Sequence, residues 1–250
     1  DGGVSDAQIA GLLTALKMRG ETLDEIVGAV KAMRARATRL ELSEPRILDT
    51  CGTGGDGAST FNISTASAFV CAAAGVTVAK HGNRAISSRV GSADVLEALG
   101  VRIDLNAEQV TRCIREIGVG FMFAPLHHSA LKHAARARRE LGYRTILNLL
   151  GPMTNPAEAT HQLIGVFDGR YCRTVAEVLN RLGSRRAMVV HGCDGLDEIT
   201  LAGPTHAAVL EAGAVREIEI DPQDFGFVLQ DASTLAGGSA AAQPQQCGQT

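Results

Sequence analysis

The sequence lacks the marks of several protein classes. Its six cysteines contain no CxxC pair and no zinc-ligand spacing, so we interpret them as thiols of a reducing compartment. No apolar run approaches the roughly 18 residues that a transmembrane helix needs, and no signal peptide opens the chain. The formal net charge of −3 gives no reason to expect nucleic acid or a membrane surface as a partner. We therefore expect a cytoplasmic protein.

Two nucleotide-binding motifs are also missing. No GK[ST] closes the glycine-rich run at 52–57, which excludes a Walker loop. The run does fit GxGxxG, but a dinucleotide site needs an acidic residue about 20 residues later to hold the ribose. The next predicted strand, 76–80, ends instead in Lys80, a cation that suits a phosphate. A nicotinamide-dependent oxidoreductase is therefore disfavoured, although an observation of tight NADH binding would support that alternative again.

The most informative stretch that is present is residues 49–65, DTCGTGGDGASTFNIST. A glycine-rich loop can turn its amides towards an anion, and the helix predicted after it directs its positive end to the same place. Further donors are the hydroxyls and one amide of Thr53, Ser59, Thr60, Asn62, Ser64 and Thr65. The pattern predicts a phosphate-binding loop, and a glycine-rich turn without a ligand is the simpler alternative.

From Arg46 onward, strand and helix patterns alternate, which predicts an α/β fold with a mostly parallel sheet. We expect strands at 46–50, 76–80, 119–124, 162–167 and 187–191, helices at 64–74, 92–99, 107–117 and 171–182, and two short strands around Gly213. Capping boxes at Ser5-x-x-Gln8 and Thr22-x-x-Glu25 predict two amphipathic helices before this region. Segments 129–141 and 144–150 have helical patterns as well.

The motifs GTGGDGxxTFNISTASAF and KHGNRxxSSxxGSADVLEALG, at 52–69 and 80–100, closely resemble those of anthranilate phosphoribosyltransferases. The likeness runs from about residue 3 to about residue 238. It implies transfer of a phosphoribosyl group from phosphoribosyl pyrophosphate to the amine of anthranilate, in tryptophan biosynthesis, by a Mg²⁺-dependent homodimer. Pyrimidine nucleoside phosphorylases share this fold but lack the TFNIST run and KHGNR. The alternatives are a nucleoside phosphorylase-like enzyme, another phosphoribosyltransferase, or an inactive fragment that only binds ligand.

The resemblance also implies two domains with the ligand site in the cleft between them. A small helical domain would comprise 1–44 with 126–150, and an α/β domain 45–125 with 151–238. The chain begins with Asp1, so we expect the first part of the helical domain to be missing, and likewise the last helices of the α/β domain. Residues 239–250 are mostly small and polar, and we expect them to form a disordered tail.

Site residues are carried over from the family motifs. For phosphoribosyl pyrophosphate these are Gly52, Gly55, Asp56, Thr60, Asn62, Ile63, Ser64, Thr65, Lys80, His81, Gly82, Asn83, Arg84, Ser87, Ser88 and Ser92. For anthranilate they are Gly52, Asn83, His128 and Arg138, and for Mg²⁺ they are Ser64, Asp197 and Glu198.

The chemistry of these residues agrees with the roles, and each has a simpler alternative. Asp197 and Glu198 offer hard oxygen ligands, but a bare DE pair is more often a solvated turn. The planar guanidinium of Arg138 suits a carboxylate, unless it belongs only to a basic helix surface. Asp56 would repel a phosphate, so we expect it to meet Mg²⁺ or a ribose hydroxyl. Zinc at the nearby histidines is disfavoured because no carboxylate or cysteine completes a ligand set.

Overall fold

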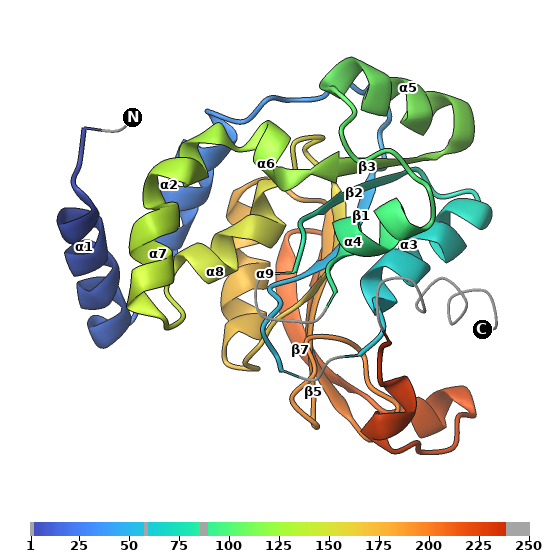
Figure 1. Ribbon diagram of the computed structural model, residues 1–250. Coiled ribbons are helices and arrows are strands. Elements are labelled where there is room, and N and C mark those ends of the chain that lie inside the picture. The colour runs from blue at the N-terminus through green and yellow to red at the C-terminus, as the bar shows by residue number, and fades with distance from the viewer. Residues whose placement is uncertain (1–2, 58–59, 86–89, 239–250) are drawn as a thin grey trace.

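The computed structural model describes residues 3–57, 60–85 and 90–238 (Figure 1). The expected tail at 239–250 lies outside them. Two N-terminal helices pack beside one sheet that is flanked by helices, so the predicted fold class is confirmed. The division into the two discontinuous domains stays a prediction.

The N-terminal helices α1 (Asp6–Arg19) and α2 (Leu23–Arg34) begin at the two predicted capping boxes, because Ser5 and Thr22 accept hydrogen bonds from backbone N–H groups of the first turns. Their apolar side chains join α8 (Leu147–Leu150) and α9 (Tyr171–Arg181) in one hydrophobic core. The helix α7 (Ala135–Leu141) packs on α1. The N-terminal helices are thus held against the sheet's own layer of helices.

The sheet has seven strands in the order β3-β2-β1-β4-β5-β6-β7 within the described residues. The strands are β1 (Leu48–Gly52), β2 (Val78–Gly82), β3 (Val119–Phe123), β4 (His161–Gly165), β5 (Arg186–Gly192), β6 (Thr205–Glu211) and β7 (Ala214–Ile220). The first five are parallel and the last two pair antiparallel, around Gly213 as predicted. Strand order reverses between β1 and β4, and in open α/β sheets ligands bind at the carboxyl ends of strands at such a switch point.

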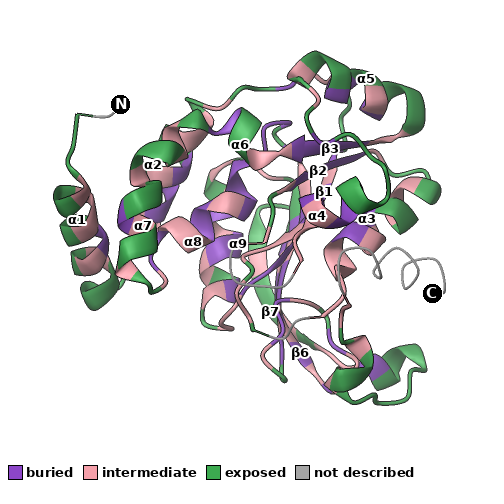
Figure 2. Ribbon diagram, viewed as in Figure 1, coloured by how far each residue is buried: buried purple, intermediate pink, exposed green. Residues whose placement is uncertain are grey.

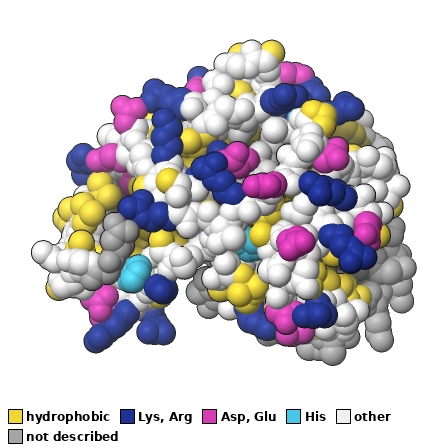
Figure 3. Space-filling view, turned by 90° about the horizontal axis from the view of Figure 1, so that it is seen from above, with side chains coloured by type: hydrophobic (Ala, Val, Ile, Leu, Met, Phe, Trp, Pro, Cys, Tyr) yellow, Lys and Arg dark blue, Asp and Glu magenta, His cyan; other side chains and the backbone are white. Residues whose placement is uncertain are grey.

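Helices cover both faces of the sheet. Alternate residues of β3 point to opposite faces: Phe121 packs against α4 (Ser92–Ala98), and Met122 against α5 (Ala107–Ile117). The helix α3 (Ile63–Ala73) contacts β1, β2 and β3, whereas α9 contacts β5, β6 and β7. The outer side of α5 is largely exposed (Figure 2). Seen from above, the surface carries basic and acidic side chains interspersed (Figure 3).

Some boundaries differ from those predicted. β1 and β2 begin and end two residues later than expected, because their ends pair with β4 and β3, which the local pattern does not show. The helix α4 begins at Ser92 as predicted, with Gly91 as its N-cap, and ends at Ala98, one residue earlier than expected. The segment 129–141 begins as a 3-10 helix (Ser129–Ala134) before α7. A short helix, α6 (Ala124–His127), starts around Pro125, which is compatible with a first helical turn.

Candidate active site

The glycine-rich loop leaves the sheet at the switch point, beside the end of β4. Thr53 donates its backbone N–H to the carbonyl oxygen of Gly165 at 2.9 Å, and its Oγ1 accepts from the N–H of Phe167 at 3.0 Å. Gly54 and Gly55 then have φ angles of 66° and 78°, the left-handed region that favours glycine. The start of the loop is therefore fixed on β4, and its next residues need to be glycine.

The acidic turn that carries Asp197 lies directly on the ends of β1 and β4. Asp197 Oδ2 accepts a hydrogen bond from the N–H of Gly54 at 2.7 Å. A Cβ on Gly52 would lie 2.5 Å from that oxygen, and a Cβ on Gly165 would collide with the carbonyl oxygen of Asp197. Because Gly52 and Gly165 are register partners, two adjacent strand ends without side chains make the space that this turn occupies.

Three carboxyl groups influence one another here. Burial, and then the charge of Asp56, raises the pKa of Asp197 to about 6. Burial, and then the charge of Asp197, raises the pKa of Glu198 to about 8, while Lys80 acts in the opposite direction. Each shift reports that a negative charge is disfavoured at this place unless a cation is near. Asp197 is buried and Glu198 is half-buried, so this DE pair does not lie on a fully solvated turn.

Lys80 is buried in the middle of β2 and not at its end as predicted, and its side chain reaches Ser64 on α3. Its Nζ donates to the carbonyl oxygen of Thr50 at 2.5 Å and to Ser64 Oγ at 3.1 Å. Burial lowers the pKa of Lys80, and the charges of Asp49 and Glu198 oppose that shift. Lys80 therefore contacts the middle of β1, whereas Asp197 contacts the loop just after the end of this strand.

The N-terminus of α3 is also at this place. Asn62 is its N-cap, and Asn62 Oδ1 accepts from the N–H of Thr65 at 3.1 Å and from the Thr65 hydroxyl at 2.5 Å. The hydroxyls of Ser64 and Ser92 approach the same oxygen, each at 3.3 Å. The predicted residues Asn62, Ser64, Thr65 and Ser92 therefore form one polar cluster, and Ile63 is the first residue of the helix whose positive end lies there.

The residues that follow Lys80 in the KHGNR motif make contacts with other parts of the molecule. The His81 ring is buried and lies edge-on to His128, with ring centroids 4.9 Å apart. Arg84 forms ion pairs with Asp94 at 3.0 Å and Glu97 at 2.8 Å, both on α4, and these contacts raise its pKa. The charge of Arg84 is therefore already engaged by carboxylates. Ser87 and Ser88 lie outside the described residues.

Of the residues expected to bind anthranilate, His128 is buried, Gly52 and Arg138 are half-buried, and Asn83 is exposed. Burial lowers the pKa of His128 to about 4, so its ring is neutral at neutral pH. Arg138, on α7, is half-buried, and within the described ranges its guanidinium has no hydrogen-bond or ion-pair partner. Burial lowers the pKa of Arg138 as well, which is the environment in which a carboxylate ligand would be favoured. No hydrogen bond in the described part of the chain joins Arg138 to Gly52 or Asn83.

The far end of the glycine loop is held by a segment distant in sequence. Thr60 forms an isolated antiparallel bridge with Ala236, and Phe61 donates its N–H to the carbonyl oxygen of Leu235 at 2.9 Å. A Cβ on Gly237 would collide with the backbone of Thr60. No sequence signal pointed to this contact.

Sequence reasoning also missed Asp49 and Asn155, which are buried beneath the loop. Asp49 accepts from the N–H of His81 at 3.1 Å and from Asn155 Nδ2 at 2.7 Å. The same Nδ2 donates to the carbonyl oxygen of Ala79 at 2.8 Å, so the pair fixes β1 to β2 behind the site. A carboxylate beside the apolar residues Ile47 and Leu48 was the available signal for Asp49. Asn155 had none.

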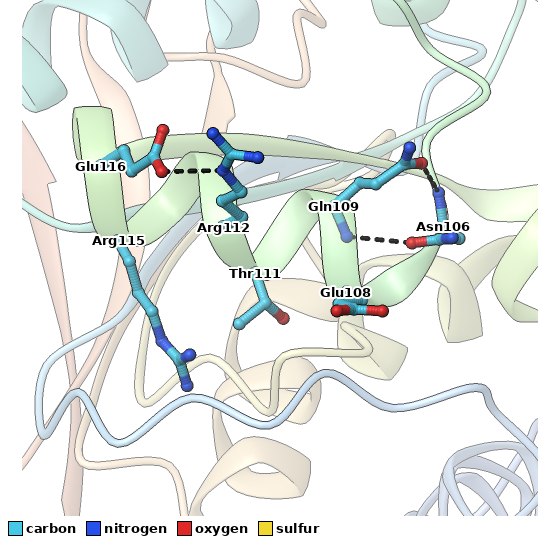
Figure 4. A pocket seen from close by; sticks show the side chains of 7 residues that line it. All are labelled: Asn106, Glu108, Gln109, Thr111, Arg112, Arg115 and Glu116. Atoms are coloured by element: carbon cyan, nitrogen blue, oxygen red, sulfur yellow. Dashed lines mark hydrogen bonds and ion pairs between the residues drawn. The ribbon is translucent and has the colours of Figure 1, made fainter.

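A surface hollow of about 520 Å³ lies elsewhere, along α5 (Figure 4). Its lining consists of Asn106, Glu108, Gln109, Thr111, Arg112, Arg115 and Glu116, all from this helix and its N-cap. Arg112 and Glu116 pair with each other at 2.7 Å, and Asn106 with Gln109 closes the helix cap. None of these residues belongs to the predicted site. The candidate site is therefore the end of β1, not this hollow.

Two features are absent from the described residues. No helix there has the length and apolar character to cross a bilayer. No three histidine, cysteine, aspartate or glutamate side chains there are grouped to hold a metal ion by themselves.

Comparisons with known proteins agree with this geometry. Residues 44–246 match the model of the glycosyl transferase family a/b domain, and residues 1–37 match that family's helical bundle domain. Anthranilate phosphoribosyltransferase of Cellvibrio japonicus is 63% identical over 226 residues, which cover 90% of this chain and 66% of the relative. The enzyme of Moorella thermoacetica is 57% identical and is covered to 70%, with 96% of this chain matched. The chain thus spans about two thirds of the length of these curated relatives.

Solved structures show the same similarity. Anthranilate phosphoribosyltransferase of Thermus thermophilus superposes with a TM-score of 0.93 at 45% identity, covering 98% of this chain and 73% of that one. The Saccharomyces cerevisiae enzyme in complex with PRPP and Mg has a TM-score of 0.87 at 28% identity, covering 97% and 68%. Another structure of the yeast enzyme contains 4-fluoroanthranilate, with a TM-score of 0.86, 26% identity, and coverage of 97% and 67%. The chain belongs to the anthranilate phosphoribosyltransferase family.

Proposed function

We propose that this chain transfers the phosphoribosyl group of phosphoribosyl pyrophosphate to the amine of anthranilate, a step of tryptophan biosynthesis. The observation that carries the proposal is that Lys80 bonds both Thr50 on β1 and Ser64 on α3, while Asp197 bonds Gly54 in the loop that joins these two elements. Cytoplasmic location and a homodimer are further proposals, which rest on family resemblance alone.

Phosphoribosyl pyrophosphate would lie along the glycine loop and the N-terminus of α3. Backbone N–H groups of the loop and the positive end of the helix would bind phosphate oxygens. Lys80 would add a buried cation beside Ser64. A buried amine held by two oxygens needs no reorganisation when the ligand arrives, which favours electrostatic stabilisation of a leaving group.

The acidic residues fit Mg²⁺. Magnesium is usually held by one or two carboxylates together with phosphate oxygens and waters, so a complete cage of protein ligands is not needed. Ser64, Asp197 and Glu198 would hold the ion, with Asp56 close by, and the raised pKa values of Asp197 and Glu198 mark carboxylates that a cation would stabilise. When bound, the ion would neutralise charge that develops on the departing pyrophosphate. The yeast structure with PRPP and Mg supports this choice of metal.

Anthranilate would bind with its carboxylate on Arg138 and its ring near His128. The half-buried guanidinium of Arg138 supplies the charge, and the neutral, buried His128 supplies a wall without a competing cation. This orientation would present the amine to the anomeric carbon of the bound sugar.

The reaction then needs positioning more than acid–base chemistry. The bond from the anomeric carbon to the pyrophosphate oxygen breaks, a bond to the anthranilate nitrogen forms, and one amine proton is released. The transition state resembles an oxocarbenium ion, as in glycoside hydrolysis. Residues that hold both substrates in line and stabilise the pyrophosphate supply the rate enhancement.

The test is the loss of anthranilate fluorescence when phosphoribosyl pyrophosphate and Mg²⁺ are added. We expect turnover by the unmodified chain, and at least about 100-fold slower single turnover at limiting Mg²⁺ for Asp197→Asn with Glu198→Gln. Glu219→Ala, an exposed acidic residue on β7, is the control. Undiminished turnover in the double variant would reject the role of the carboxylates.

Two further arms separate the alternatives. Consumption of nucleosides with inorganic phosphate, but not of anthranilate, would identify a nucleoside phosphorylase. Calorimetric binding of phosphoribosyl pyrophosphate with Mg²⁺ but no turnover would identify a chain that only binds ligand.

A further inference from the structure

One of the arginine–aromatic contacts of this structure joins Arg144 to Phe167. The guanidinium of Arg144 is stacked over the ring of Phe167, with its central carbon 4.1 Å from the ring centroid. Tyr171 packs on the same ring edge-on, at 5.4 Å between centroids. Within the part of the chain that is described, the Arg144 guanidinium has no carboxylate partner, so the ring is its contact. An arginine over an aromatic ring presents a planar, delocalised cation, which a lysine does not.

Phe167 forms a hydrogen bond with Thr53, the first residue of the glycine loop after β1. Its backbone N–H donates to Thr53 Oγ1 at 3.0 Å, and the Thr53 N–H donates to the carbonyl oxygen of Gly165 at 2.9 Å. The next residue, Gly54, donates to Asp197. Movement of Phe167 would therefore move the loop and its contact with the acidic turn.

Arg144 is held from the other side by the N-terminal helix. Lys17 Nζ on α1 donates to the carbonyl oxygen of Arg144 at 2.9 Å and lies 5.3 Å from the Tyr143 ring centroid. The Tyr143 hydroxyl bonds Thr14 Oγ1 at 2.5 Å. These contacts secure the residues that directly follow α7, the helix that carries Arg138.

We propose that the Arg144–Phe167 stack is a positioning contact that couples the anthranilate half of the site to the phosphoribosyl half. The contacts run from α7 and α1 through Arg144 and Phe167 to Thr53 at the loop. A ligand bound at the glycine loop then favours the position in which Arg138 binds anthranilate. Because coupling between two sites is reciprocal, anthranilate bound at Arg138 also favours ligand binding at the loop. This inference rests on the proposed function, because it assumes that the two half-sites hold those two ligands.

The test measures coupling between two ligands that cannot react. The Kd of anthranilate is measured by calorimetry with and without inorganic pyrophosphate plus Mg²⁺. In the unmodified chain we expect pyrophosphate with Mg²⁺ to tighten anthranilate binding about fivefold or more. Arg144→Lys keeps the charge but removes the planar guanidinium, so pyrophosphate should then change the Kd of anthranilate by a factor near one. The Kd of pyrophosphate measured alone should change less than about twofold in this variant.

Further variants separate coupling from a loss of folding. Thr53→Val has a similar shape but no hydroxyl acceptor, and Phe167→Leu has no ring, so each should abolish the coupling as Arg144→Lys does. Arg139→Lys, an exposed position on α7, should retain it. Urea midpoints of all variants show whether each remains folded, and the Kd of pyrophosphate reports an intact loop.

The outcomes are distinct. Coupling that survives in Arg144→Lys, or is absent in an unmodified chain that binds both ligands, overturns this inference and leaves the proposed function standing. An unmodified chain that binds neither anthranilate nor pyrophosphate overturns both.

Discussion

The Oδ2 atom of Asp197 lies 2.5 Å from the point where a β-carbon on Gly52 would be. A strand residue and a loop residue far apart in sequence thus compete for one space. The competition is resolved by glycine, which leaves the carboxylate free to bond the N–H of Gly54. This relationship gives the most direct prediction.

Gly52→Ala should displace the Asp197 carboxylate. We expect transfer activity at limiting Mg²⁺ to fall about 100-fold, by analogy with loss of one preorganised electrostatic group, and stability to fall by about 1–3 kcal/mol through overpacking. The measurement is single-turnover anthranilate consumption together with urea unfolding. Gly28→Ala is the matched control, because Gly28 lies in α2 with open space around it, and there alanine should stabilise the helix by about 1 kcal/mol. Full activity in Gly52→Ala would contradict the prediction.

Lys80→Met tests the buried cation. Methionine has similar length but no charge, so binding of phosphoribosyl pyrophosphate should weaken by about 2–4 kcal/mol, since a buried charge pair with the ligand is lost. Calorimetry of the ligand with Mg²⁺ measures this, with Lys132→Met on the exposed surface as control. An unchanged Kd would mean that Lys80 has only a structural role towards Thr50 and Ser64.

Asn155→Ala tests the support behind the site. It removes the donor to Asp49 and to the carbonyl oxygen of Ala79, leaving two buried acceptors with one partner fewer. We expect a loss of about 2–4 kcal/mol in the free energy of unfolding, with Gln223→Ala at an exposed position near zero. Urea unfolding measures this change. A loss of less than about 0.5 kcal/mol in the free energy of unfolding would show that the Asp49 carboxylate finds another hydrogen-bond partner.

His128 predicts a particular pH dependence of stability. Its folded-state pKa of about 4 lies below the value of about 6.5 for an unfolded histidine, so the unfolded chain binds a proton more readily. The stability that this residue contributes is present above about pH 6.5 and is lost as the pH falls towards 4. At pH 5 the free energy of unfolding is lower by about 2 kcal/mol than at neutral pH.

Urea unfolding at pH 7.5 and pH 5 checks this. The loss between the two pH values should be about 2 kcal/mol smaller in His128→Gln than in the unmodified chain. His133→Gln, on the exposed surface, should leave the difference unchanged. Equal losses in the chain with and without His128 would sink the prediction.

The β–loop–α unit could be predicted from the sequence because its signals are local. The glycine run and the apolar helix behind it lie within one short stretch, and the capping boxes of α1 and α2 were confirmed. The parallel sheet followed from alternating patterns. The family motifs named Lys80 and Asp197; in the structure Lys80 bonds Thr50 within β1, and Asp197 bonds Gly54 just after it.

The remainder depends on contacts between distant segments. The last residues of β1 are set by pairing with β4, so the strand could not be seen to include Gly52. Asn155 meets Asp49, and Arg144 meets Phe167, only after the chain has folded, and neither pair has a periodic or composition signal. Arg84 was expected at a phosphate, but its neighbours on α4 are carboxylates that only the fold brings near.

The antiparallel bridge between Thr60 and Ala236 has a practical consequence for protein engineering. Residues 235–237 hold Thr60 and Phe61 through the bridge, through the carbonyl oxygen of Leu235 and through the close approach of Gly237. Shortening the chain before Leu235, or giving Gly237 a side chain, should therefore displace Thr60 and the far end of the glycine loop without replacing any residue of the proposed site.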